Sequence, residues 1–199
     1  FNSLYSITSG NSNVCLGYSS GGKLTASNQN TFVGAFSGQS SGNTSSVEGN
    51  VGIGSYSLLK SLGSYNTAIG TYSARNLNYG SIGYYNVCLG YNAFSDSSGD
   101  SNIAIGNSSL IVSGGNNNIG IGSYVADSLT NGNNNIFIGC NAEPSDTIST
   151  NQIVIGKNAK GIKNNSAVIG NSDLTDVYIG ANGSATLNCN NILVSNVNI

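Results

Sequence analysis

Short apolar stretches between an asparagine and a glycine recur along this chain, and they dominate its predicted fold. Eight copies read Asn, three mostly apolar residues, Gly, and three looser copies begin with Gln, Ser or Asp. The eleven copies end at Gly17, Gly34, Gly54, Gly70, Gly90, Gly106, Gly122, Gly139, Gly156, Gly170 and Gly180. Most of these glycines follow one another at a nearly constant interval, as from Gly17 to Gly34 and from Gly106 to Gly122. Such a short period predicts a solenoid whose coils bury apolar surface against their neighbours.

Each copy of this phrase predicts a short β-strand. Its second and fourth residues face one side of the strand, and its third residue faces the other. The fourth residue is always Leu, Val or Ile, whereas the third ranges from Gly to Phe and Tyr. Apolar residues on both sides indicate a strand that is covered on both sides. One side would be the inside of the coil, and an identical chain is the simplest source of a surface for the other.

The two ends of the phrase predict two kinds of corner. The closing glycine can adopt a positive φ without steric cost and lets coils stack closely where the chain turns. The leading asparagine has two readings. It can form an amide ladder from coil to coil, as in cross-β structures, or it can reflect the ordinary turn preference of Asn.

Composition favours an ordered and associating chain. Asn, Ser, Gly and Thr make up more than half of the 199 residues, charged residues make up 7%, and the net charge is −2. A flexible linker has no reason to keep Ile and Val in register. A narrow core with little charge favours self-association, and we predict an all-β homotrimer wound about a common axis. We divide the chain into an entry segment (1–12), a β-roll (13–187) and a C-terminal tail (188–199).

Two classes of partner are not expected. No apolar run reaches the ~20 residues that a membrane span needs. Binding to phosphate backbones requires clustered Lys and Arg, and Lys157, Lys160 and Lys163 are the only hint of a cluster. We therefore predict no membrane insertion and no nucleic acid. The chain begins at Phe1 and not at Met, so we take it as part of a longer protein.

The repeated phrase resembles the head repeats of trimeric autotransporter adhesins. The segments Asn66-Thr-Ala-Ile-Gly70 and Asn102-Ile-Ala-Ile-Gly106 are the best fits. The resemblance implies a left-handed parallel β-roll in a bundle of three chains. Only the interval from Gly156 to Gly170 keeps the family's compact spacing, and this departure concerns the loops more than the roll.

The chain also resembles virus and phage fibres with similar Asn-Thr-Ala-Ile-Gly runs. Such fibres often precede an endosialidase-type intramolecular chaperone that assembles the trimer and then cuts itself off. The tail from Asp176 to Leu187, followed by Asn191 to Ile199, looks like the segment that leads into such a chaperone. This resemblance implies a mature C-terminus near Ile199.

The cysteines favour the viral reading over the bacterial one. Cys15 and Cys88 are both third residues of their phrases, but four coils of ~4.8 Å separate them, far beyond the reach of a disulfide. Unpaired thiols suit a fibre folded in a reducing host cytoplasm and carried on the virion surface. A bacterial cell-surface adhesin is the alternative. We interpret Cys15 and Cys88 as small apolar core residues.

Several kinds of chemistry lack their residues in this chain. There is no histidine, which removes Ser-His and Cys-His nucleophiles and the commonest transition-metal ligand. The acidic pairs Asp96/Asp100 and Glu143/Asp146 lie in turn-like stretches and are poor candidates for glycoside hydrolysis. We predict a non-enzymatic protein with no catalytic residue, no metal site and no cofactor.

Tyrosines supply the candidate binding surface. Nine of the eleven lie between Tyr5 and Tyr91, and exposed rings beside amides and hydroxyls suit sugar binding. The insertion between Gly70 and Asn86 predicts a binding loop. The predicted receptor-binding residues in it are Arg75, Tyr79, Tyr84 and Tyr85. For tyrosines close after the glycines we favour packing across the trimer interface, namely Tyr56, Tyr72 and Tyr124.

These observations predict a viral attachment domain that binds a host surface glycan or glycoprotein. A purely structural fibre shaft without a ligand is the main alternative. An ice-binding solenoid needs a face of regularly spaced Thr, and only Thr31 and Thr67 occupy the second strand position. A tailspike-like glycan hydrolase ranks below the structural shaft and below the ice-binding solenoid.

Overall fold

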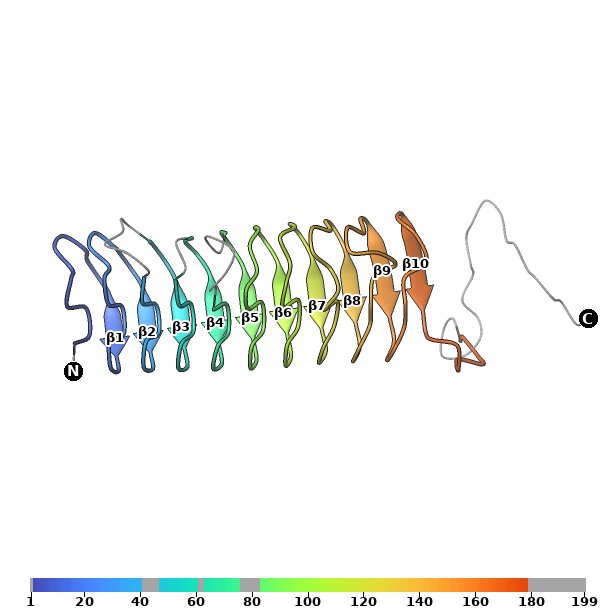
Figure 1. Cartoon of the computed structure of the whole chain (residues 1–199), viewed down its shortest axis with the longest axis horizontal. Coiled ribbons are helices and arrows are strands. Elements are labelled where there is room, and N and C mark those ends of the chain that lie inside the picture. The colour runs from blue at the N-terminus through green and yellow to red at the C-terminus, as the bar shows by residue number, and fades with distance from the viewer. Residues whose placement is uncertain (1, 41–46, 61–62, 76–82, 179–199) are drawn as a thin grey trace, which may run out of the picture.

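The chain forms a parallel β-solenoid with one continuous sheet along its length (Figure 1). The computed structural model describes residues 2–40, 47–60, 63–75 and 83–178. Its strands are β1 (Val14–Leu16), β2 (Thr31–Val33), β3 (Val51–Ile53), β4 (Thr67–Ile69), β5 (Val87–Leu89), β6 (Ile103–Ile105), β7 (Ile119–Ile121), β8 (Ile136–Ile138), β9 (Gln152–Ile155) and β10 (Ser166–Ile169). Each strand pairs in parallel with the next one in the sequence. The predicted all-β solenoid is confirmed, while its handedness and trimeric state stay predictions.

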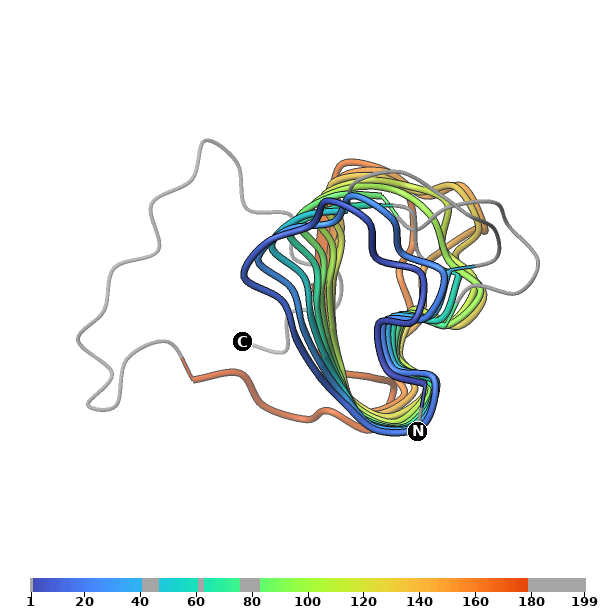
Figure 2. The same cartoon turned by 90° about the vertical axis from the view of Figure 1, so that its left-hand side faces the viewer.

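The repeated phrase sets the register of the sheet. Each residue of a phrase pairs with the same position of the next, as in the pairing of Val14 with Thr31 and of Leu16 with Val33. The same register holds from β1 to β10. Seen along the rod, the described coils follow one another closely on their strand side and at the corner below it (Figure 2). Differences in coil length are therefore taken up on the remaining side.

The third residue of each phrase points into the coil. From β2 to β9 these residues are buried, although they range in size from Gly to Phe. Large and small residues are paired between neighbouring coils: Phe32 lies opposite Gly52, and Phe137 lies opposite Gly120. A Cβ placed on Gly52 would lie only 3.0 Å from the Phe32 ring. Because each phenylalanine uses space that a glycine leaves open, the third position varies while the interior stays filled.

A second inward row follows the closing glycines. The third residue after the glycine is Ser, Ala or Val, and it is buried in the coils of β1 to β9. The hydroxyls of Ser20, Ser37, Ser73 and Ser109 donate to the carbonyl of the third phrase residue one coil on, whereas the Ser57 hydroxyl donates to the Gly54 carbonyl of its own coil. The Ser37 Oγ lies 2.9 Å from the Gly52 oxygen, and the Ser109 Oγ lies 2.9 Å from the Gly120 oxygen. These bonds satisfy polar groups that would otherwise be buried without a partner.

The leading asparagines form a ladder at the end of the sheet where the strands begin, which we call the Asn edge. Each side-chain oxygen accepts the backbone N–H of the equivalent residue in the next coil. For Asn66 to Asn50 the distance is 2.8 Å, and for Asn102 to Asn86 it is 2.9 Å. The side-chain amide of Asn102 also donates to the Gly115 carbonyl, at 2.9 Å. These asparagines are buried from β2 to β8, so the amide-ladder reading is confirmed.

The closing glycines form the opposite end of the sheet, the Gly edge. From Gly17 to Gly156 their φ angles lie between +127° and +143°. A Cβ on Gly34 would lie 2.5 Å from the backbone oxygen of Gly54, which is closer than any side chain tolerates. Both reasons given for glycine at this corner, a positive φ and close stacking of coils, are therefore met.

The two ends of the rod differ. The entry segment joins the first coil through backbone hydrogen bonds from Leu4 to Ser20 and from Thr8 to Thr25. The eleventh predicted coil is not confirmed, because the described part of its phrase, 176–178, forms no strand, and Tyr178 is 87% exposed. The rest of that phrase and the tail 188–199 lie outside the described residues.

Among the described residues Cys15, Cys88 and Cys140 are free thiols. Cys88 lies buried in the coil, and burial raises the pKa of its thiol well above the ordinary value. Nothing in the described part of the chain is a helix of the length and apolarity that a membrane crossing requires.

Candidate functional site

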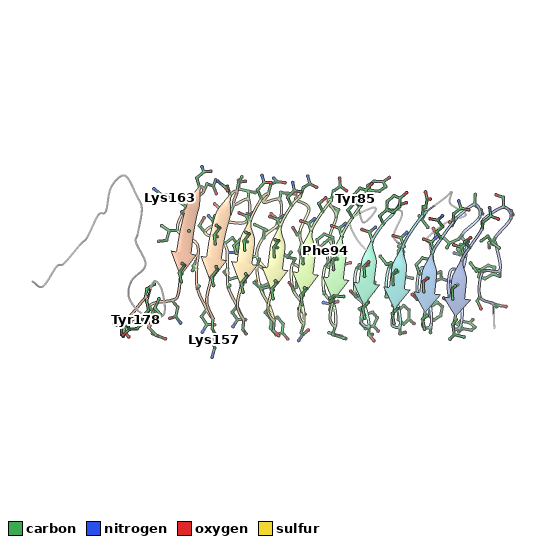
Figure 3. All side chains as sticks on the ribbon, turned by 180° about the vertical axis from the view of Figure 1, so that it is seen from behind. Tyr85, Phe94, Lys157, Lys163 and Tyr178 are labelled. Atoms are coloured by element: carbon green, nitrogen blue, oxygen red, sulfur yellow. The ribbon has the colours of Figure 1, made fainter. Side chains whose placement is uncertain are left out.

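Three tyrosines gather at the Asn edge and form what we call the tyrosine platform: Tyr65, Tyr84 and Tyr85. Figure 3 shows Tyr85 on this edge of the sheet. The Tyr65 and Tyr85 rings are stacked with centroids 5.3 Å apart and planes within 5° of parallel. The Tyr84 ring lies 6.4 Å from that of Tyr85 and is tilted by 43°. The three side chains are 44%, 49% and 60% exposed, in chain order. The platform is therefore an ordered aromatic surface open to solvent.

The fold places two of these rings at an equivalent position. Tyr65 and Tyr85 each precede the leading asparagine, and the backbone there is left-handed in every coil from β1 to β10. The other coils carry Ser, Gln, Gly or Asn at this position. Small or amide side chains tolerate the left-handed region, whereas a bulky residue is uncommon there. The two tyrosines add nothing to the buried core, so their placement points to a role on the surface.

Neighbouring groups hold the platform in place. The Tyr65 ring lies against Gly49, where a Cβ would come within 2.7 Å of it. The hydrogen bond from the Tyr65 hydroxyl to Glu48, and the negative charge of that carboxylate, raise the pKa of Tyr65. The backbone N–H of Tyr84 donates to Asp100 Oδ1 at 2.8 Å. Because backbone and side-chain contacts fix these residues, a ligand would meet a largely preorganised surface.

The structure brings together only part of the predicted receptor-binding set. Tyr84 and Tyr85 lie side by side and are exposed. Arg75 instead lies with its guanidinium carbon 4.4 Å from the centre of the Tyr72 ring, in the row that follows the Gly edge. Tyr79 lies outside the described residues. Tyr65 was missed, although its position before Asn66 matches that of Tyr85 before Asn86.

A second aromatic row runs along the Gly edge of the first five coils. Its members, in order, are Tyr18, Phe36, Tyr56, Tyr72 and Tyr91. Successive centroids are 4.9 to 5.8 Å apart, so each ring contacts the ring of the next coil. Tyr56 and Tyr72 are half-buried by this stacking within one chain, whereas Tyr124 is 46% exposed. Their packing across a trimer interface stays a prediction.

The outward side of the sheet is an apolar strip, which we call the outer ribbon. It consists of the second and fourth residues of the first ten phrases, and none of them is buried. They are Val14, Leu16, Thr31, Val33, Val51, Ile53, Thr67, Ile69, Val87, Leu89, Ile103, Ile105, Ile119, Ile121, Ile136, Ile138, Ile153, Ile155, Ala167 and Ile169. Only Thr31 and Thr67 are polar, and none is charged. A monomer rarely exposes so long an apolar strip.

The acidic residues of the C-terminal coils serve local structure. Glu143 accepts hydrogen bonds from the Ser128 hydroxyl at 2.6 Å and from the Asp127 backbone N–H at 3.2 Å. Burial raises the pKa of Glu143. Asp146 accepts from the Thr147 side chain and backbone. Glu143 therefore joins two neighbouring coils, and the described residues contain no group of three side chains suited to hold a metal ion.

Comparisons with known proteins add no relative. The chain matches no family model, no curated protein and no solved structure.

Proposed function

We propose that the chain is a non-enzymatic domain of a homotrimeric fibre that attaches a virion to a glycan or glycoprotein on the host surface. It works without a cofactor and without nucleic acid. Its partners are two further copies of the same chain and the receptor. The trimer is a left-handed roll of three chains, folded in a reducing host cytoplasm and displayed on the virion. A bacterial cell surface is the alternative location.

The outer ribbon carries the fibre part of this proposal. Ten strands at ~4.8 Å spacing give an apolar strip about 45 Å long. Aliphatic groups gain about 25 cal/mol for each Å² removed from water. Because the strip has no charge, two further copies of this chain can cover it without burying an unpaired ion. The sheet has a single outward side, so contacts with two further copies in a closed trimer would cover the whole outer ribbon.

The tyrosine platform supports attachment. Exposed tyrosines offer an apolar ring face for a sugar and a hydroxyl for hydrogen bonding. Amide side chains continue the same edge, since Asn117, Asn134 and Asn151 take the place of Tyr85 in later coils. The platform also lies in the part of the chain with the longest coils, where solenoids commonly carry binding loops.

A purely structural shaft is the second candidate. The coils of β7 to β9 favour it, because Asn117, Asn134 and Asn151 stand there at the position of Tyr65 and Tyr85. Their closing glycines, from Gly122 to Gly156, also follow one another at a nearly constant interval. Such a shaft would form the same trimer and bind no receptor.

Binding to immobilised glycans separates the two candidates. We expect saturable binding of the wild-type trimer to at least one glycan on a broad array. The double variant Tyr84→Ala with Tyr85→Ala should reduce that binding at least tenfold, since each ring supplies about 1 kcal/mol or more of contact. Tyr124→Ala is the matched control, because it removes an exposed tyrosine far from the platform. An absence of saturable binding, or equal binding by the double variant while still trimeric, would favour the shaft.

A further inference from the structure

Two carboxylates border the tyrosine platform. In the row two residues before each leading asparagine, the coils of β3 to β6 carry Glu48, Ser64, Tyr84 and Asp100. The two carboxylates stand three strands apart, which corresponds to ~14 Å along the rod. They therefore lie on either side of the rings, one toward each end. The rest of this row, from β1 to β10, is Asn or Thr.

Both carboxylates interact with the platform. Glu48 lies beside the Tyr65 hydroxyl and raises its pKa. Asp100 accepts from the Tyr84 backbone N–H, and the Asp100 N–H in turn donates to Asn116 Oδ1 at 2.7 Å. Two negative charges therefore lie beside the rings.

Arg75, Lys157 and Lys163 lie away from the platform. Arg75, the only arginine, lies over Tyr72 in the row that follows the Gly edge. Figure 3 shows Lys157 on the Gly edge and Lys163 at the end of the rod beyond β9, far from Tyr85. Among the described contacts of the three platform rings there is no Lys or Arg. These contacts therefore include no cation that could hold a carboxylate, sulfate or phosphate group.

We infer that the platform selects uncharged saccharides and rejects acidic ones. A neutral sugar can stack on the exposed Tyr84 and Tyr85 rings and donate its hydroxyls to Glu48 and Asp100. An acidic sugar on the same rings would bring its negative charge within the ~8 Å screening length of these carboxylates. This inference rests on the proposed function and names the ligand class of its site. This inference gives no role to Arg75, although the sequence predicts it as a receptor-binding residue.

Matched pairs of glycans on one array test this selectivity. Each pair is a neutral oligosaccharide and the same oligosaccharide capped with sialic acid or sulfate. We expect at least tenfold stronger binding of the wild-type trimer to the neutral member. The variants Glu48→Gln and Asp100→Asn remove one negative charge each with little change of shape, and should narrow this preference at least threefold. Asp127→Asn is the control, because it makes the same charge change on an exposed residue in a distant coil.

The outcomes distinguish the two proposals. Binding that depends on Tyr85 and is equal or stronger for the acidic member would overturn the inference and leave the attachment function standing. An unchanged preference in both carboxylate variants would also overturn it. If no glycan of either kind binds in a manner that depends on Tyr85, the attachment function itself fails.

Discussion

The N-terminal coils of β1 to β5 and the C-terminal coils of β6 to β10 share one interior and differ at their corners. Both halves have the same strand register and the same glycine stack, and both continue the Asn ladder. At the Gly edge, the first half carries five aromatic rings in a row, each close to the next, whereas the second carries one exposed tyrosine, Tyr124, among amides and lysine. The tyrosine platform lies in the first half as well.

This difference separates what the fold requires from what it permits. Inward residues must together fill a narrow coil, so they stay small or apolar even where their size changes from coil to coil. The two edges must supply hydrogen bonds or close stacking, so their Asn and Gly positions hardly vary. Residues just outside the edges make few such contacts and can vary freely. The two longest intervals between closing glycines, from Gly34 to Gly54 and from Gly70 to Gly90, belong to the first half. The proposed attachment site accordingly belongs to the first half, and the second half is the more regular one.

Substitution of a closing glycine should give the largest loss of stability, and an equal loss in both halves. Gly34→Ala and Gly122→Ala each place a Cβ within 2.6 Å of a backbone oxygen one coil away, at a φ of +130° or more. We expect each to lower the free energy of unfolding by more than about 3 kcal/mol, as measured by urea denaturation. Ser123→Ala is the neighbouring control and should change little. A mild effect in one half only would contradict the shared interior.

Loss of one rung of the Asn ladder should come next. Asn118→Ala removes the acceptor for the backbone N–H of Asn135 and the donor to the Gly132 carbonyl. Buried groups left without partners cost about 1 to 3 kcal/mol each, so we expect a loss of about 2 to 4 kcal/mol in thermal or urea unfolding. Asn66→Ala in the first half should behave alike. Asn107→Ala, a half-buried amide outside the ladder, is the control, and an equal loss there would argue against the ladder.

The aromatic row should stabilise only the first half. Tyr56→Ala removes contacts with Phe36 at 4.9 Å and Tyr72 at 5.4 Å, for which we expect a loss of about 1 to 2 kcal/mol. Tyr124→Ala is matched in backbone, with φ of +53° against +60°, but the Tyr124 hydroxyl accepts from the Asn107 amide at 3.4 Å. Tyr124→Ala should therefore lower the free energy of unfolding by at most half as much as Tyr56→Ala. Equal losses in urea denaturation would mean that the two rows do not differ energetically.

The smallest effect concerns Glu143 and pH. Burial raises the pKa of this carboxyl above its unfolded value, so the folded state binds the proton more readily than the unfolded state. Its contribution to stability is therefore full below the unfolded pKa and is lost as pH rises through the folded pKa. As the pH rises from 4 to 7, the melting temperature of the wild type should fall relative to that of Glu143→Gln. The opposite slope would show that the hydrogen bonds from Ser128 and Asp127 outweigh burial.

The sequence predicts the repeated elements of this fold well because each is repeated many times. Strand positions, the glycine corners and the Asn ladder all follow from one phrase. The phrase alone does not tell which of its residues face the interior, because its second, third and fourth positions are all mostly apolar. The pairing of Phe32 with Gly52 resolves this choice, but it becomes visible only once the coils are placed in register.

The candidate site was predicted less completely, because it depends on contacts between coils. Tyr84 and Tyr85 were found as exposed residues of an insertion. Tyr65 was overlooked, since it belongs to a different coil and its proximity arises from stacking. Arg75 is near Tyr85 in the sequence, but it follows the Gly edge of β4 and lies over Tyr72, whereas Tyr85 precedes β5 at the Asn edge.

The solution mass of this chain, measured by light scattering on a size-exclusion column under reducing conditions, tests the central claim most directly. We predict three times the chain mass of 20.2 kDa. Ile105→Asp with Ile121→Asp places charge in the outer ribbon and should give a single chain with unchanged circular dichroism. A wild-type mass of one chain, with the outer ribbon left in water, would contradict the trimeric fibre.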